Sequence, residues 1–170
     1  DELQKQIPVI KKRFLYAEDF AKASLKDIFS AGKLKSSEVL TADYFPNAVL
    51  INDGKMNFTT QSLPWLAQLS PYRDGVVINA NNDSLHDVLL FGNFYENNNQ
   101  MGRNDADFGT ILINKGNGKF DCESINGLQI KGQVRHIKKI NIGKQEAYIL
   151  VRNNDSVMVI KFKEGFILSK

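Results

Sequence analysis

One cysteine, two histidines and a small net charge are the scarce features of this 170-residue sequence. With Cys122 alone, no disulfide can form within the chain. No apolar run approaches the roughly 20 residues that a membrane-spanning helix needs, so we expect no transmembrane segment. The net charge of +3 arises from basic and acidic residues dispersed along the chain, so we expect no nucleic-acid partner.

Sequence signatures of catalysis are also missing. The chain contains no nucleophile elbow, no phosphate-binding loop, no His-Glu metal motif and no dinucleotide-binding fingerprint. Cys122 has no recognisable catalytic neighbours, and His86 and His136 lie too far apart in the sequence for a local metal motif. We therefore predict a protein that is not an enzyme.

Residues 1–35 predict a short helical N-terminal segment. Apolar residues recur there at helical spacing, and basic residues fall largely off that stripe. Ser24 and Asp27 have the spacing of a capping box, and Gly32 is placed to end an element. Because Pro8 interrupts the stretch, we expect two or three short helices ending near Gly32.

From residue 36 to residue 170 the sequence predicts β-structure. Short apolar runs are separated by Asn, Gly and Asp, and none is long enough for a helix. The expected strands lie at Val39–Leu40, Ala48–Ile51, Gly75–Ile78, Asp87–Phe91, Thr110–Ile113, Ala147–Val151 and Val157–Phe162. Such spacing is typical of antiparallel meanders in propellers, sandwiches or barrels. The predicted fold is mainly β.

An internal repeat favours the propeller among these folds. Val49–Phe58 aligns with Ile111–Phe120 at a constant offset of 62 residues. In both copies a strand enters an Asn/Gly turn that needs a positive φ at Gly54 or Gly116, and we expect the final phenylalanine to pack between neighbouring sheets. With a further hairpin in Val134–Lys163, about two and a half β-propeller-like blades are expected, which amounts to a partial or open propeller.

The loop Asn79–Asp87 carries side chains suited to a hard cation. Oxygen-bearing side chains alternate along the loop, and a backbone carbonyl is available between them. The candidate calcium ligands are Asn79, Asn81, Asp83, the carbonyl of Leu85, and Asp87. This alternation lets a tight loop point successive oxygens inward, as calcium loops of the Asp-x-Asn-x-Asp-Gly type do.

The segment Gly75–Phe120 resembles a known kind of repeat. Its loop Asn79–Asp87, its Phe91-Gly92-Asn93-Phe94 stretch and its turn at 114–120 are similar to FG-GAP/VCBS-type repeats of integrin-like β-propellers, as in repeat proteins of Bacteroidetes-like bacteria. The resemblance implies propeller blades, calcium in the blade loop, and a secreted, periplasmic or cell-surface location. It also implies that the chain is a fragment of a larger repeat protein.

The loop departs from the family pattern at two positions. Asn79 stands where the family usually has Asp, and Ser84 replaces the glycine that eases the turn. Losing one carboxylate removes a charge from the cation site, so the pattern predicts weak calcium binding or none. The alternative is that Asn81, Asn82 and Asp83 cap a turn through hydrogen bonds from side chain to backbone. Both interpretations stay open at this point.

The polar insert Tyr95–Phe108 is longer than a hairpin requires. Long polar loops on a rigid scaffold often carry recognition, so we expect a ligand-binding loop here. Its candidate ligand-binding residues are Asn97, Asn98, Asn99, Arg103 and Asp105. Of two interpretations for Arg103 and Asp105, an ion pair that pins the loop is favoured over a ligand-facing pair.

Trp65 follows Pro64 in a run that also contains Leu63 and Leu66. A lone tryptophan can serve as an exposed platform for a sugar or a peptide, but these apolar neighbours favour packing. We therefore expect Trp65 to pack against other residues.

Three functional hypotheses follow. The first is a non-enzymatic extracellular or cell-envelope module that binds a protein or glycan ligand through its polar loops. The second is a hydrolase-like propeller whose carboxylates Asp83, Asp87, Asp105 and Asp107 gather in one cleft. The third is a purely structural role in a larger assembly, because an open array leaves edge strands able to pair with another chain and to form a dimer.

Overall fold

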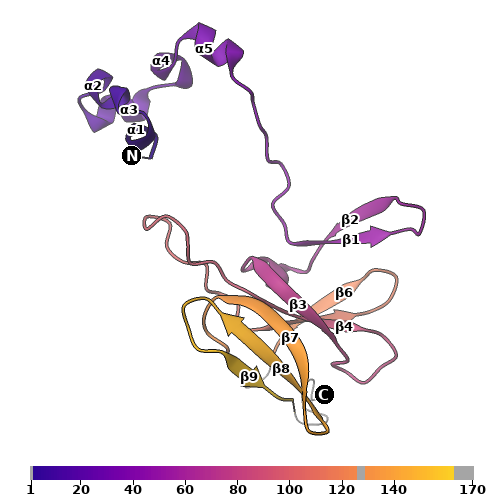
Figure 1. Cartoon of the computed structure of the whole chain (residues 1–170). Helices are drawn as coiled ribbons and strands as arrows, with labels where there is room; N and C mark the ends of the chain where they lie inside the picture. Colours follow the sequence, from indigo (N-terminus) through magenta and orange to yellow (C-terminus); the bar gives the residue numbers. More distant parts are fainter. Residues whose placement is uncertain (1, 126–128, 163–170) are drawn as a thin grey trace. The chain divides into compact units, whose positions relative to one another are not determined.

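The computed structural model of this chain describes residues 2–125 and 129–162 (Figure 1). The chain divides into two compact units, with the boundary between Tyr44 and Phe45. The end of the predicted third blade, at Lys163, lies outside the described residues.

The N-terminal unit consists of short helices. Those in the described residues are α1 (Glu2–Gln6), α2 (Val9–Arg13), α3 (Ala17–Lys22), α4 (Leu25–Ile28) and α5 (Ala31–Ser36). The capping box is confirmed, since the backbone N–H and the hydroxyl of Ser24 donate to Asp27 Oδ2 at 2.9 and 2.6 Å. The expected end at Gly32 is wrong because Gly32 lies inside α5. No described helix is long and apolar enough to cross a membrane.

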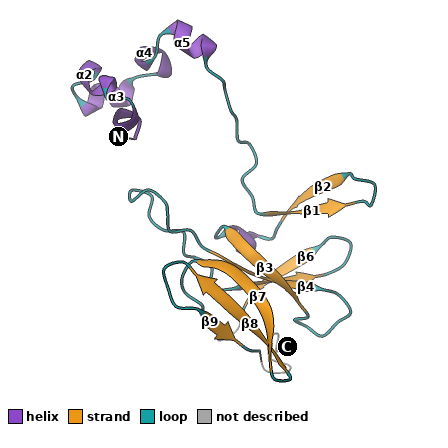
Figure 2. Cartoon of the chain, in the orientation of Figure 1, coloured by secondary structure: helices purple, strands orange, loops and turns teal. Residues whose placement is uncertain are grey.

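The second unit is built from antiparallel sheets (Figure 2). Its elements are β1 (Ala48–Asn52), β2 (Phe58–Ser62), the 3-10 helix η1 (Trp65–Gln68), β3 (Tyr72–Ile78), β4 (Asp87–Gly92), β5 (Thr110–Asn114), β6 (Phe120–Ser124), β7 (Val134–Ile142), β8 (Gln145–Arg152) and β9 (Met158–Ile160). The sheet orders are β1-β2, β3-β4-β5-β6 and β7-β8-β9. A mainly β fold is confirmed, although the strand expected at Val39–Leu40 does not form.

The hairpins β1–β2 and β5–β6 close in the same way. Asn52 lies opposite Phe58, and the two residues 62 positions later, Asn114 and Phe120, are paired likewise. The side-chain oxygen of each asparagine accepts the N–H of the glycine two residues on, at 2.8 and 2.9 Å. Those glycines have φ of 81° and 78°, as the repeat predicted. The recurrence at an offset of 62 residues is therefore structural as well as sequential.

The sheets β3–β6 and β7–β9 also resemble each other in how their strands pair. A shift of register follows Tyr72 at the start of β3 and follows Val134 at the start of β7. The asparagine after each second strand, Asn93 or Asn153, donates its backbone N–H to the carbonyl of the residue that precedes the first strand, at 3.1 and 2.8 Å. The sequence comparison had not shown this second correspondence.

The main core joins β3–β6 to β7–β9. Buried residues of both sheets and of the segments next to them form one cluster: Ile78, Ala80, Leu89, Phe91, Ile111, Ile113, Ile125, Ile130, Val134, Ile137, Tyr148, Leu150 and Ile160. The strands β3 and β7 lie against each other within this contact. Phe58, in contrast, is 55% exposed, so its expected packing between two sheets is wrong. The β1–β2 sheet has only two strands, and the face that carries Phe58 is open to solvent.

Candidate functional site

Asp87 is fully buried at the start of β4, where it ties the predicted cation loop to the sheet. Its Oδ2 accepts the N–H of Ala80 at 2.8 Å, and its Oδ1 accepts the N–H of Asn114 at 2.8 Å. The two carboxylate oxygens therefore satisfy one buried and one half-buried backbone donor. This geometry gives Asp87 a structural use that the sequence pattern did not reveal.

The remaining residues of the loop close a turn. Asn79 Nδ2 donates to the carbonyl of Asp83 at 2.9 Å, and Asn81 Nδ2 donates to Asp83 Oδ2 at 2.7 Å. Asp83 Oδ1 accepts the N–H of Leu85 at 2.7 Å, while Asn82 has a φ of 62°. The bonds of Asp83 with Asn79 and Leu85 join a side chain to the backbone, as does the bond from the N–H of Asp83 to Asn81 Oδ1 at 3.1 Å, and these are bonds of the kind that the turn-capping interpretation expects.

The donor set fits calcium in its chemistry but not in its present arrangement. Carboxylate and carbonyl oxygens are the ligands that calcium prefers, yet the four carboxylate oxygens of Asp83 and Asp87 already accept hydrogen bonds. Within the residues that the structure describes, no cluster of three or more His, Cys, Asp or Glu side chains is suited to a metal. Calcium binding by this loop stays a prediction.

The insert between β4 and β5 is a small hairpin with a polar tip. Phe94 and Asn104 exchange backbone hydrogen bonds of 2.8 and 2.9 Å at its base. A turn follows, in which the N–H of Met101 donates to the carbonyl of Asn98 at 2.8 Å. Residues 98–106 are exposed, so the tip projects its side chains into solvent.

Asn93 and Asp107 anchor the two ends of this insert. Asn93 is buried, and its amide group accepts from Ser70 Oγ and donates to the carbonyls of Asp107 and Gly132 at 2.8 to 2.9 Å. Asp107 accepts the N–H of Gly92 at 2.8 Å. Burial raises the pKa of the Asp107 carboxyl. The hydrogen bonds that it accepts from the N–H groups of Gly92 and Gly109 and from the hydroxyl of Thr110 oppose that shift. The anchor therefore joins β3–β6 to the start of the next sheet.

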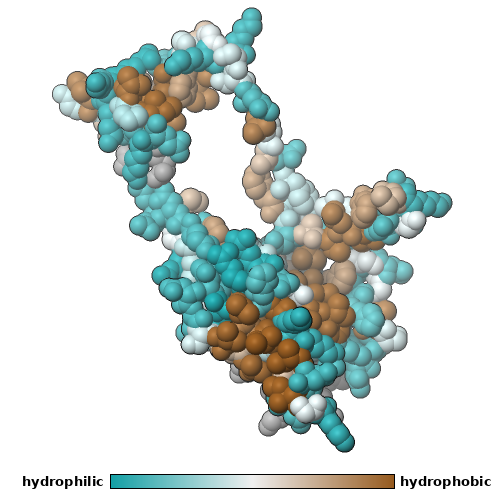
Figure 3. All heavy atoms as spheres, in the orientation of Figure 1, coloured by the Kyte–Doolittle hydropathy of each residue, from teal (hydrophilic) through white to brown (hydrophobic). Residues whose placement is uncertain are grey.

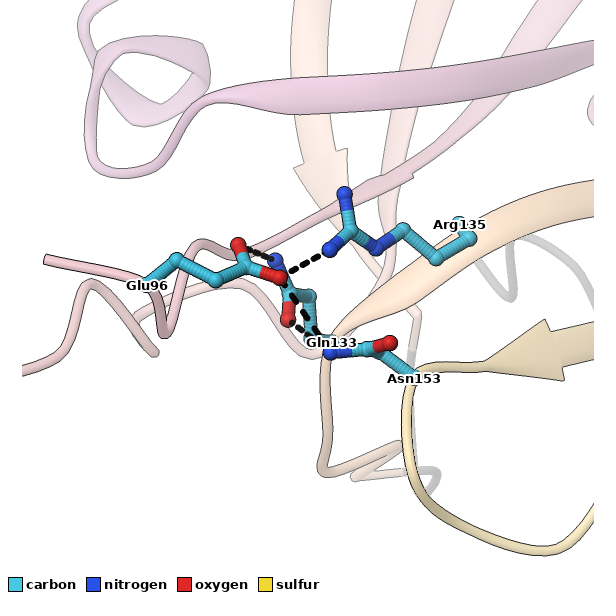
Figure 4. A network of polar contacts seen from close by, with 4 residues as sticks. All are labelled: Glu96, Gln133, Arg135 and Asn153. Atoms are coloured by element: carbon cyan, nitrogen blue, oxygen red, sulfur yellow. Dashed lines mark hydrogen bonds and ion pairs between the residues drawn. The ribbon is translucent and has the colours of Figure 1, made fainter.

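Glu96 makes the second anchor, a polar network that reaches β7 and the end of β8 (Figure 4). Gln133 Nε2 donates to Glu96 Oε2 at 2.9 Å, and Arg135 forms an ion pair with Glu96 Oε1. Asn153 Nδ2 donates to Gln133 Oε1 at 3.1 Å and to Glu96 Oε1 at 3.3 Å. The hydrogen bond from Gln133, together with the positive charge of Arg135, lowers the pKa of Glu96.

The predicted ligand-binding residues share the tip of the insert. Asn98, Asn99, Arg103 and Asp105 are exposed there, and Asn97 is half-buried. The expected ion pair between Arg103 and Asp105 is not formed among the described residues. The Arg103 guanidinium instead lies 4.9 Å from the centre of the Tyr95 ring, where a cation–π contact replaces the ion pair.

The four carboxylates of the hydrolase hypothesis are not gathered in one cleft. Asp87 is the first residue of β4, while Asp107 accepts a hydrogen bond from the N–H of Gly92, the last residue of β4. This strand of six residues separates the two sites by about 17 Å. Asp83 lies in the loop before β4, on the side of Asp87, and Asp105 lies on the insert, on the side of Asp107, so the four carboxylates do not form a single group.

Sequence reasoning missed the residues that anchor the insert: Asn93, Glu96, Asp107, Gln133 and Asn153. One signal was available, because an asparagine follows an apolar strand at both Asn93 and Asn153. The expectation for Trp65 was wrong, since its side chain is 74% exposed.

No family model, curated protein or solved structure matches this chain. Membership of the FG-GAP/VCBS type therefore stays a prediction from the residues that carry the resemblance.

Proposed function

We propose that this chain is a non-enzymatic binding module, part of a larger repeat protein, whose sheets are blades of the FG-GAP/VCBS propeller type. The four-stranded meander β3–β6 has the strand order of a propeller blade. The hairpin β1–β2 repeats its second half, and β7–β9 repeats its first three strands in register. In this proposal the blades are the rigid scaffold, with a secreted or cell-surface location.

The tip of the insert between β4 and β5 is the proposed recognition surface. The observation that carries this proposal is the contrast between a firmly held base and an exposed tip. Asn93 and Glu96 attach the base to the neighbouring sheet. A loop that is ordered before binding loses less conformational entropy when a ligand arrives. The insert thus combines a base held by the neighbouring sheet with the exposure that a binding loop needs.

The chemistry of the tip favours a glycan as the ligand. Neutral amide side chains dominate it, and an amide both donates to and accepts from sugar hydroxyls. The cation–π pair of Tyr95 and Arg103 adds an aromatic ring and a guanidinium group at the edge of the tip. A protein ligand is the alternative, for which the exposed side chain of Met101 is the supporting feature.

Binding of the whole chain to a glycan microarray tests the proposal, with affinities then measured by calorimetry. The tip variant Asn99→Ala/Gln100→Ala should lose at least tenfold in affinity with an unchanged unfolding midpoint. Asn141→Ala, an exposed amide in β7, is the matched control and should bind like the unchanged chain. A chain that binds no glycan, or a tip variant that binds normally, would overturn the assignment.

A further inference from the structure

The outer face of β7–β9 carries an open apolar strip on β8 and β9. This strip comprises Ile149, Val151 and Val159, which lie on one side because Ile149 pairs with Val159 and strand residues alternate between the faces. On β7, the exposed residues Lys138 and His136 lie opposite Ile149 and Val151 and border the strip. Val151 is 40% exposed and Val159 48% exposed. Figure 3 shows hydrophobic side chains gathered over these strands. Adjacent exposed apolar residues of this kind mark an interaction surface.

The same positions in the preceding sheet are buried. Leu89 pairs with Ile111 in β3–β6, and Ile149 pairs with Val159 at the corresponding place in β7–β9. Leu89 and Ile111 are completely buried in the core that joins the two sheets. On β8 and β9 the outer face therefore repeats a face that, one sheet earlier, is covered by another sheet. On the first strand the two faces differ, since Val76 lies opposite Leu89 and Lys138 lies opposite Ile149.

The hairpin β1–β2 carries the complementary surface. The hairpin face comprises Leu50 and Phe58, which lie on one side of β1–β2 because Leu50 pairs with Thr60. Leu50 corresponds to Leu112 through the offset of 62 residues, and Leu112 corresponds in register to Ile160. Ile160 is buried in the contact between the sheets, on the side of β7–β9 that meets β3–β6.

The hairpin face is itself exposed. Leu50 is 62% exposed and Phe58 is 55% exposed. In the contact between β3–β6 and β7–β9, two different sheet faces pack together. The unit from Phe45 onward carries an exposed copy of one of these faces on its first hairpin, β1–β2, and an exposed copy of the other on its last sheet, β7–β9. Among the described residues, neither the hairpin face nor the outer face of β7–β9 is covered by another sheet. The contact already buried between β3–β6 and β7–β9 shows how two such faces pack together.

We propose that the chain associates head to tail, with the hairpin face of a second copy docking on the outer face of β7–β9. The contact is heterologous, since each copy offers two different surfaces, so association continues beyond a dimer. The area is small, which places the dissociation constant in roughly the micromolar to millimolar range. This inference rests on the recurring register of the sheets and is independent of the proposed glycan ligand.

Sedimentation velocity of the whole chain over a concentration series tests the proposal. The average mass should rise steadily without a plateau at the dimer. The variants Leu50→Lys and Val159→Lys place a charge at already exposed positions, so both should stay folded by circular dichroism. Each should lower the association constant at least tenfold. Val39→Lys, exposed in the other unit, should associate like the unchanged chain.

Mixing the two variants separates this contact from every symmetric one. The Leu50→Lys chain keeps an intact outer face, and the Val159→Lys chain keeps an intact hairpin face. Their mixture should form a one-to-one dimer that grows no further, although each variant alone is monomeric. A chain that stays monomeric at millimolar concentration, or a mixture without heterodimer, would overturn the proposal. Pairing through an edge strand would instead give a symmetric dimer that both variants retain.

Discussion

Replacing Asp87 by asparagine tests whether the loop before β4 is held by a buried carboxylate. In the folded chain both Asp87 oxygens accept backbone N–H groups, those of Ala80 and Asn114. An asparagine keeps one acceptor oxygen and turns an NH2 group toward the other backbone donor. One buried N–H then loses its partner, and the charge that strengthens both hydrogen bonds is gone.

The expected loss in the free energy of unfolding for Asp87→Asn is about 2–4 kcal/mol, the sum of an unsatisfied buried donor and one weakened hydrogen bond. Asp83→Asn is the matched control. Its carboxylate also accepts two hydrogen bonds, from Asn81 and Leu85, but water can replace these at its exposed position. Its loss should be within about 0.5 kcal/mol, as for most surface changes.

Urea unfolding followed by far-ultraviolet circular dichroism measures both variants, once with calcium and once with a chelator. The structural role predicts that the large loss for Asp87→Asn is the same under both conditions. Equal losses for the two variants would refute the reasoning. A loss that appears only with calcium would also refute it and would instead support the predicted cation site.

Three further changes test other parts of the fold. Gly92→Ala should unfold the chain or cost more than about 3 kcal/mol, because a Cβ would overlap the carbonyl oxygen of the residue before β3. Gly32→Ala, with open space around the glycine, should be neutral or slightly stabilising, and thermal melts compare the two variants. Leu150→Ala should cost about 2–5 kcal/mol in urea unfolding, since its fully buried side chain would leave a cavity in the core. Glu96→Gln should lower the unfolding midpoint at pH 7, and the difference should shrink as the pH falls below 4.5. The folded pKa of Glu96 lies below its ordinary value of 4.5, so its contribution is fully present above that value and is lost as the pH falls through the folded pKa. A difference that stays constant from pH 7 down into the acid range would contradict this assignment.

Local chemistry made the hairpins and the capping box predictable. The turn at Gly54 needs only an asparagine two residues earlier and a residue that tolerates positive φ. The turn at Gly116 repeats both features. The cap at Ser24 likewise depends on a carboxylate three residues away. Alternation of apolar residues then located most strands, because the side-chain period of a strand is two.

The polar anchors of the insert could not be predicted in the same way. Glu96 meets Gln133 and Arg135 across 37 and 39 residues of sequence. Asn93 reaches Gly132 across 39 residues. Such contacts exist only once two sheets have packed together, and no short sequence pattern records which polar side chains will meet. The use of Asp87 was hidden for the same reason, since its partner Asn114 belongs to the neighbouring strand.

The sequence by itself determined the turns, the strand pattern and the recurrence at 62 residues, because these depend on φ preferences and on neighbours a few residues apart. Only the tertiary structure decided which apolar faces are covered. Leu89 and Ile149 occupy corresponding positions, yet the first is completely buried and the second is half-buried. The same holds for Leu112, which is 5% exposed, and for Leu50 on the open hairpin. Burial is set by whether another sheet lies against the residue, and that depends on contacts between segments far apart in the chain.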